Sequence, residues 1–244
     1  MSAASSFTIL NPNGTFPVVL TCEHASYALP PEYGTLGIPA DELRRHIGWD
    51  IGARAVVQEI IQHIDSTAIL SQYSRLLIDC NRDLSDDDLI IPESDGTRVP
   101  ANMHLTEAEQ RRRIRQFYQP YHAAIDHALA QKIPAPVLLL SVHSFTPVLG
   151  EKKRSFDLGI LFDRYEDLAR EFGQGLSHAG YRVRSNEPYS GYEGLIFSAR
   201  SHGERHNLVY LEIEINNGLL LDRTNIAAMG QKLSQVLTAV FPSR

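Results

Sequence analysis

Short apolar runs rich in β-branched residues alternate with amphipathic helical patterns along this chain. This alternation constrains the fold more than any other feature, because it is typical of a layered α/β domain. The run Val137–Leu140 is apolar on both faces, as expected of a strand that helices cover on each side. The predicted strands are Pro17–Thr21, Thr67–Gln72, Leu76–Ile78, Val137–Val142, Leu158–Phe162, Arg182–Arg184 and Leu208–Ile215.

Helices are predicted between and after these strands. Thr106 and Glu109 have the spacing of a capping box, and Pro120 should bend the helix that follows. Gly180 is expected to end a helix that begins between Asp163 and Glu166. Two further helices are predicted over Asp50–His63 and Thr224–Val240, and two long loops over Asn81–Met103 and Asn186–Gly194.

Length and charge narrow the class of protein. The 244 residues suit a single domain spanning 1–244, and 23 basic against 29 acidic residues give a net charge of −6. This balance argues against non-specific nucleic-acid binding. No apolar run approaches the roughly 20 residues of a spanning helix, and Met1–Phe7 forms a short polar tail unlike a signal peptide. We therefore expect a cytoplasmic protein without nucleic-acid or membrane partners, and the sequence leaves its oligomeric state open.

Several predicted strands end abruptly in residues that ionise or bind metals. One apolar run ends in Glu23-His24, another in Asp79-Cys80-Asn81-Arg82, a third in His143-Ser144 and a fourth in Asn216-Asn217. In open α/β sheets, ligands bind outside the carboxyl ends of the strands. Four strands that deliver such groups to one edge would build a polar site.

Two strand-end histidines among carboxylates suggest a zinc site. A catalytic zinc ion usually has three ligands from His, Asp or Glu and keeps one position open. His24 and His143 are the first two candidates. Asp50 ranks above Glu23 as the third, because neighbours in a strand point to opposite faces and Glu23 precedes His24. The structural alternative is that the histidines are hydrogen-bonded residues and Asp50 is a helix N-cap.

Glu212 and Glu214 alternate within one apolar strand, so both lie on the same face. Either could be a general base for a water molecule that the metal activates, or the strand could be an edge strand with one wet face. Arg82 could pair with a nearby aspartate or bind a substrate carboxylate through two hydrogen bonds.

The strand-end motifs resemble those of the N-formylglutamate amidohydrolase family, relatives of the zinc carboxypeptidases and of the succinylglutamate and aspartate deacylases. The stretches that carry the resemblance occur in the family's order over about four fifths of the chain. They are Thr21–Ser26, His46–Asp50, Ser74–Arg82, Leu140–Phe145 and Leu211–Asn216.

The resemblance implies a three-layer α/β/α sandwich with a mixed, mostly parallel central sheet and one zinc ion per chain. It implies that His24, Asp50 and His143 bind the metal and that Glu214, rather than Glu212, is the catalytic base. It implies a small N-acyl amino acid as the substrate, N-formylglutamate being the example. The residues expected to bind that substrate are Asn81, Arg82 and Ser144.

Two other functions fit the same residues. One is a zinc amidase or peptidase that acts on a muropeptide or a short acidic peptide. The other is a non-enzymatic protein that binds a ligand on the same scaffold. Bound metal would argue against the second, and activity on muropeptides would favour the first.

Overall fold

The computed structural model describes residues 5–132 and 137–241, and its centre is a seven-stranded sheet. The strand order is β1-β3-β2-β6-β11-β9-β10. Strands β3, β2, β6 and β11 run parallel. β1 is antiparallel to β3, β9 is antiparallel to β11, and β10 is parallel to β9. The expected mixed, mostly parallel sheet is confirmed. Its strands are β1 (Phe7–Leu10), β2 (Val18–Cys22), β3 (Thr67–Ser71), β6 (Leu138–Phe145), β9 (Leu158–Leu161), β10 (Val183–Ser185) and β11 (Val209–Asn216).

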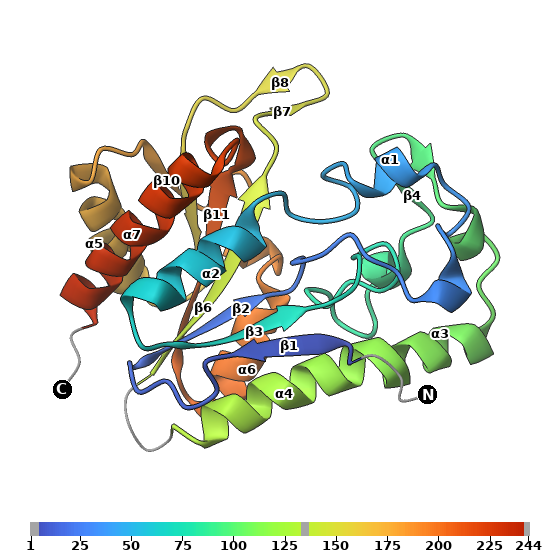
Figure 1. Ribbon diagram of the computed structural model, residues 1–244, viewed down its shortest axis with the longest axis horizontal. Helices are drawn as coiled ribbons and strands as arrows, with labels where there is room; N and C mark the ends of the chain where they lie inside the picture. Colours follow the sequence, from blue (N-terminus) through green and yellow to red (C-terminus); the bar gives the residue numbers. More distant parts are fainter. Residues whose placement is uncertain (1–4, 133–136, 242–244) are drawn as a thin grey trace.

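Helices cover both faces of the sheet, which confirms the three-layer α/β/α sandwich (Figure 1). On one face lie α2 (Ala53–His63), α5 (Glu166–His178) and α7 (Arg223–Val240); on the other lie α4 (Gln119–Ala130) and α6 (Phe197–His206). Val18 and Leu20 pack into the first core, whereas Val19 between them packs into the second. This strand is therefore apolar throughout, because alternate side chains enter two different cores.

The helix that was expected to bend at Pro120 is divided into three parts. Thr106 caps α3 (Glu107–Arg113) by accepting a hydrogen bond from the Glu109 backbone N–H at 3.2 Å, as the capping-box spacing predicts. A π-helical turn over Ile114–Tyr118 then leads into α4. Proline has no N–H and crowds the carbonyl four residues earlier, so a wider turn just ahead of Pro120 relieves both conflicts.

The prediction of a strand at Leu76–Ile78 is wrong. These residues form a buried turn whose carbonyls bond to side chains instead of a neighbouring strand. Asn102 donates to the Leu76 carbonyl at 2.8 Å, and Arg113 donates to the Leu77 carbonyl at 3.0 Å. The apolar run fills the second core as a strand would, but distant polar side chains satisfy its backbone.

Three further elements differ from what the sequence predicts. Phe7 begins a strand, β1, that pairs with the outer edge of β3, although the N-terminal residues were expected to form only a polar tail. The helix predicted from Asp50 begins at Ala53, after Gly52 with a φ of 85°. The helix α6 was not predicted, because its sequence is polar and lacks a clear apolar stripe.

The remaining elements are short, and half of them lie in the two predicted loops. They are the helix α1 (Ala40–Leu43), the hairpins β4 (Glu93–Ser94) with β5 (Thr97–Arg98) and β7 (Val148–Leu149) with β8 (Lys152–Lys153), and 3₁₀ turns at Pro31–Tyr33, Asp87–Ile90, Pro100–Asn102, Gly191–Glu193 and Asn217–Leu219.

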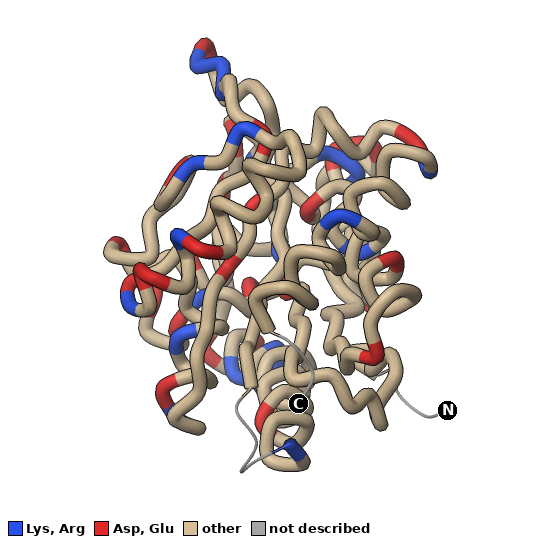
Figure 2. The backbone as a smooth tube through the Cα atoms, turned by 90° about the vertical axis from the view of Figure 1, so that its left-hand side faces the viewer, with Lys and Arg blue, Asp and Glu red and all other residues tan. Residues whose placement is uncertain are grey.

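Charged residues of both signs are interspersed over the molecule in the view of Figure 2. Within residues 5–132 and 137–241, no helix combines the length and apolarity needed to cross a bilayer.

Candidate metal and active site

The carboxyl ends of β2, β6 and β11 meet at one edge of the sheet and form the floor of a pocket of about 580 Å³. Polar side chains from these strand ends and from the turn after Leu77 converge there, as strand topology predicts. All seven residues that the sequence proposed for the site line this pocket: His24, Asp50, Asn81, Arg82, His143, Ser144 and Glu214.

His24, Asp50 and His143 form a buried three-residue cluster. The Asp50 carboxylate lies between the two imidazoles: Oδ1 is 3.4 Å from His24 Nδ1, and Oδ2 is 2.8 Å from His143 Nδ1. The two rings meet edge to face, with centroids 4.8 Å apart. His24 Nδ1 is buried and has no hydrogen-bond partner among the residues that the structure describes. The cluster thus offers two imidazole nitrogens, one of them without a hydrogen-bond partner, and one carboxylate. This donor set fits zinc.

Asp50 reaches this position because it precedes the helix and does not cap it. The left-handed conformation of Gly52 lets the chain turn into α2 two residues later. The Asp50 backbone N–H donates to the His24 carbonyl at 3.0 Å, and the Ser144 backbone N–H donates to Asp50 Oδ2 at 3.1 Å. The carboxylate is thus anchored to the ends of both β2 and β6.

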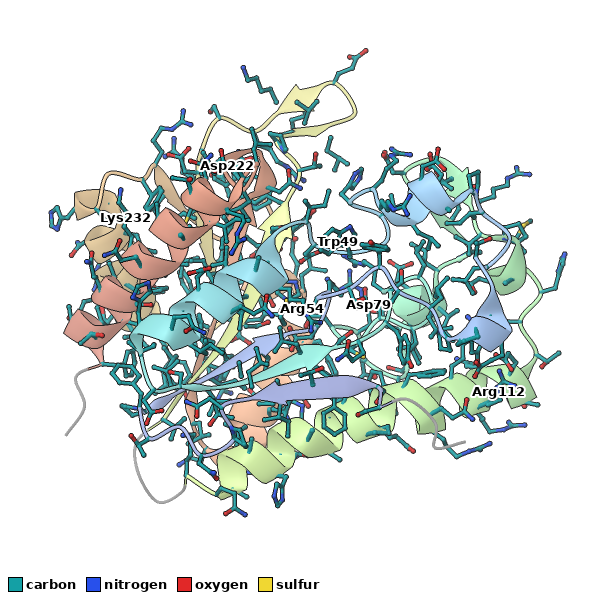
Figure 3. All side chains as sticks on the ribbon, viewed as in Figure 1. Trp49, Arg54, Asp79, Arg112, Asp222 and Lys232 are labelled. Carbon is teal, nitrogen blue, oxygen red and sulfur yellow. The ribbon has the colours of Figure 1, made fainter. Side chains whose placement is uncertain are left out.

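A second carboxylate lies behind His24. Asp79 Oδ1 is 2.7 Å from His24 Nε2, and the Asn81 backbone N–H donates to the same oxygen at 2.8 Å. Arg75 donates to Asp79 Oδ2 at 2.7 Å. These contacts, with the positive charge of Arg75 foremost, outweigh burial and hold the pKa of Asp79 well below its usual range. In Figure 3, Asp79 lies just beyond the arrowhead of β3.

Glu23 lies on the far side of His143. Its Oε2 is 3.0 Å from His143 Nε2, away from the nitrogen that faces Asp50. Three hydroxyl groups donate to the same carboxylate: Ser141 at 2.5 Å, Ser198 at 2.8 Å and Tyr121 at 2.9 Å. The carboxylate that the sequence left as the second choice for a ligand is therefore outside the His24–Asp50–His143 cluster.

Glu212 and Glu214 both face the pocket, as their spacing predicts. The Glu212 carboxylate accepts a hydrogen bond from Asn81 at 3.1 Å, and burial raises its pKa to about 7. Within residues 5–132 and 137–241, the buried Glu214 Oε2 has no hydrogen-bond partner, and burial raises the Glu214 pKa well above its ordinary value. Of the two carboxylates, Glu212 is held by a hydrogen bond from Asn81, whereas the buried Glu214 Oε2 is not held by one.

The neighbouring strand gives Glu214 room. Gly159 on β9 stands opposite Glu214 across the ladder, and a Cβ there would lie 1.9 Å from the Glu187 carbonyl oxygen and 3.4 Å from the Glu214 Cβ. A larger residue at position 159 would displace the loop that closes this side of the pocket.

The three residues expected to bind substrate are engaged to different degrees. The Asn81 amide is committed within the protein, since its Oδ1 accepts from the Ser198 N–H and its Nδ2 donates to Glu212. The Ser144 hydroxyl donates to the Ile51 carbonyl at 2.8 Å. Arg82 donates from Nη1 to the Asn81 carbonyl at 3.0 Å, its Nε lies 3.9 Å from Asp86 Oδ2, and its side chain is 18% exposed. Its remaining donors are therefore the ones best placed for a ligand.

The sequence did not predict which residues form hydrogen bonds to Glu23 and His24 from outside the pocket. Tyr121 belongs to the apolar stripe of α4, and Ser198 lies on the unpredicted α6, so neither carried a signal. Asp79 did carry one, because it follows an apolar run directly. His202 and His206 do not line the pocket; they contact Asp126 between α4 and α6, at 2.7 and 2.9 Å.

Comparison with known proteins identifies the family. The model of the N-formylglutamate amidohydrolase family matches residues 16–221. A gene product from Agrobacterium tumefaciens of known crystal structure is 33% identical, with 97% of this chain and 95% of that chain covered and a TM-score of 0.93. The N-formylglutamate amidohydrolase from Ralstonia eutropha has the same fold, with 22% identity, a TM-score of 0.77 and 97% of each chain covered. Among curated proteins, none matches this sequence. The family match spans most of the chain and confirms the resemblance seen in the strand-end motifs, so this chain belongs to the N-formylglutamate amidohydrolase family.

Proposed function

We propose that this chain is a zinc-dependent amidohydrolase that cleaves the amide bond of an N-acyl amino acid, such as N-formylglutamate. The observation that carries the proposal is the buried His24–Asp50–His143 cluster with its unpartnered His24 Nδ1, placed at the floor of the pocket. Membership of an amidohydrolase family supports the reaction class.

His24, Asp50 and His143 would hold one zinc ion through two ring nitrogens and one carboxylate. When bound in such a site, zinc polarises an amide carbonyl and lowers the pKa of a coordinated water molecule to about 7. The three residues of the cluster are buried at the strand ends, where low exposure to water strengthens their charge interactions.

Glu214 is the proposed general base. Its free, buried oxygen can accept a proton from the attacking water and then donate it to the departing amine. Burial raises the pKa of Glu214, and a more basic carboxylate is a better acceptor for the proton of the attacking water.

Arg82 is the proposed anchor for the substrate α-carboxylate. A guanidinium with free donors can bind a carboxylate through two parallel hydrogen bonds, which sets the direction of the scissile amide. Asn81 and Ser144 would form the adjoining wall, with the Asn81 side chain supporting Glu212.

The proposal is tested by metal analysis followed by a substrate screen. Protein purified without chelators should contain about one zinc ion per chain, and His24→Ala and His143→Ala should each lose it. The wild-type protein should then release the acyl group from N-formylglutamate, or from an N-acetyl or N-succinyl amino acid in a parallel screen. Absence of metal after incubation with zinc would instead favour a ligand-binding protein, and selective activity on muropeptides would favour a peptidoglycan amidase.

A further inference from the structure

The carboxylate of Glu23 is held by groups from three different parts of the fold. Tyr121 comes from α4, Ser198 from α6, and Ser141 from β6, and all three donate hydroxyl hydrogen bonds to it. The fourth contact is His143 Nε2 at 3.0 Å. A carboxylate offers about four lone-pair positions, so Glu23 is saturated and has no free oxygen for a metal ion.

The position of this carboxylate decides which nitrogen of His143 can act as a ligand. An imidazole that binds a metal through one nitrogen carries its proton on the other, and the acceptor of that proton sets the orientation of the ring. For His143, Nδ1 faces Asp50 and Nε2 faces Glu23. Three fixed hydroxyl donors leave the Glu23 carboxylate little freedom to move away from the ring.

We infer that Glu23 is a positioning residue, which accepts the Nε2 proton of His143 and so directs Nδ1 toward Asp50 and His24. This inference rests on the proposed function, because it concerns the affinity of the cluster for zinc. The other imidazole follows the same plan: His24 Nε2 contacts Asp79, and His24 Nδ1 faces Asp50.

Glu212 is the competing acceptor for the same proton. Its Oε2 is 3.6 Å from His143 Nε2, farther than that of Glu23, and it already accepts from Asn81. A hydrogen bond weakens steeply over this difference in distance, so Glu23 should dominate. Glu212→Gln is therefore the matched variant: it removes a neighbouring buried carboxylate without touching the shorter contact.

The test is the zinc dissociation constant, measured by competition with a chromophoric chelator. Glu23→Gln should weaken zinc binding about 10- to 100-fold, the range found when such supporting carboxylates are lost. Glu212→Gln should weaken it much less. Equal affinity in Glu23→Gln and wild type would overturn the inference, as would a larger loss in Glu212→Gln.

Two further measurements separate positioning from loss of folding. Tyr121→Phe removes one donor to Glu23 but leaves the carboxylate, so it should lower the melting temperature while keeping zinc affinity near wild type. Glu23→Asp keeps the charge but withdraws it from Nε2, so it should weaken zinc binding and shift the ¹⁵N resonance of His143 Nε2 in the zinc-loaded protein. An unchanged resonance and affinity in Glu23→Asp would contradict the inference. Wild-type protein that binds no zinc would overturn the proposed function together with it.

Discussion

Glu214 stands directly opposite His143 across the parallel ladder between β6 and β11. Opposed residues in a ladder project to the same face, so the proposed base and a proposed ligand enter the pocket side by side. A slip of one residue in this register would turn Glu214 into the core and bring an apolar neighbour into the site. The eight residue pairs that join β6 to β11 therefore also align the proposed base with the proposed metal ligand.

Replacing the proposed base should separate catalysis from metal binding. Glu214→Gln keeps the size of the side chain but removes proton transfer, so kcat should fall about 10²- to 10⁴-fold. Zinc content should stay at the wild-type value when His24, Asp50 and His143 hold the metal; a loss of zinc would instead assign it to the second possible group, His143 with Glu212 and Glu214. Steady-state kinetics and metal analysis on the same preparation check both points. A near wild-type kcat would reject this role for Glu214.

The matched variant for this experiment is Glu212→Gln. Glu212 is one pleat away on the same face, and Asn81 already donates to its carboxylate. Its kcat should fall less than that of Glu214→Gln. The reverse order would assign the base to Glu212.

Arg82 should act mainly on substrate binding. Arg82→Lys keeps the positive charge but loses the planar fork, so KM should rise while kcat changes less. Loss of one charge-assisted hydrogen bond is worth about 1.5–3 kcal/mol, which corresponds to roughly a 10- to 150-fold fall in kcat/KM. Kinetics with an N-acyl amino acid and with its amide, which lacks the α-carboxylate, would check the assignment. The amide should be a poor substrate for wild type, and its kcat/KM should differ little between wild type and Arg82→Lys.

A histidine pair outside the pocket should make the stability of the folded protein sensitive to acid. His122 Nδ1 lies 2.8 Å from His202 Nε2, and burial together with the His202 charge lowers the pKa of His122 from 6.5 to about 3. Glu23 and Asp126 partly oppose this shift, and Arg205 adds to it. A depressed histidine pKa means that the unfolded chain binds more protons, so this part of the stability is present above pH 6.5 and is lost as pH falls toward about 3.

The variant His122→Gln should make unfolding less dependent on pH in that window. The free energy of unfolding should be measured by urea denaturation at several pH values. As the pH falls through this window, it should decrease by on the order of 1–3 kcal/mol more for wild type than for the variant. Parallel curves for the two proteins would show that His122 does not titrate differently on unfolding.

The packing of α2 against α7 leaves no room for a side chain at position 230. A Cβ there would lie 2.4 Å from the Glu59 Cβ, so Gly230→Ala should destabilise the protein by about 1–3 kcal/mol. Gly173 on α5 is the control, because its nearest neighbour would be Val183 at 3.5 Å, an ordinary contact. Gly173→Ala should raise stability by about 0.4–1 kcal/mol through reduced freedom of the unfolded chain. Thermal unfolding of both variants measures the contrast.

Much of the architecture was readable from local patterns. Six of the seven predicted strands follow from apolar runs and α2 from helical apolar spacing, because burial against a sheet requires such patterns. The helix α5 follows from its start and stop signals, Asp163–Glu166 and Gly180. The strand-end positions of His24 and His143 were readable for the same reason, since polar groups that interrupt an apolar run at its end must lie at the sheet edge.

What the sequence determined by itself was six strands of the central sheet, most of the helices that cover it and the residues delivered to one edge. Only the tertiary structure decided how those residues combine. Leu76–Ile78 has the pattern of a strand, but Asn102 and Arg113, 26 and 36 residues from the carbonyls they bind, hold it as a turn. Asp50 and Glu23 are equally acidic in sequence, yet one faces Nδ1 of His143 and the other faces Nε2. Periodicity reports which face of an element is buried, whereas hydrogen-bond partners from distant parts of the chain decide what each buried polar group does.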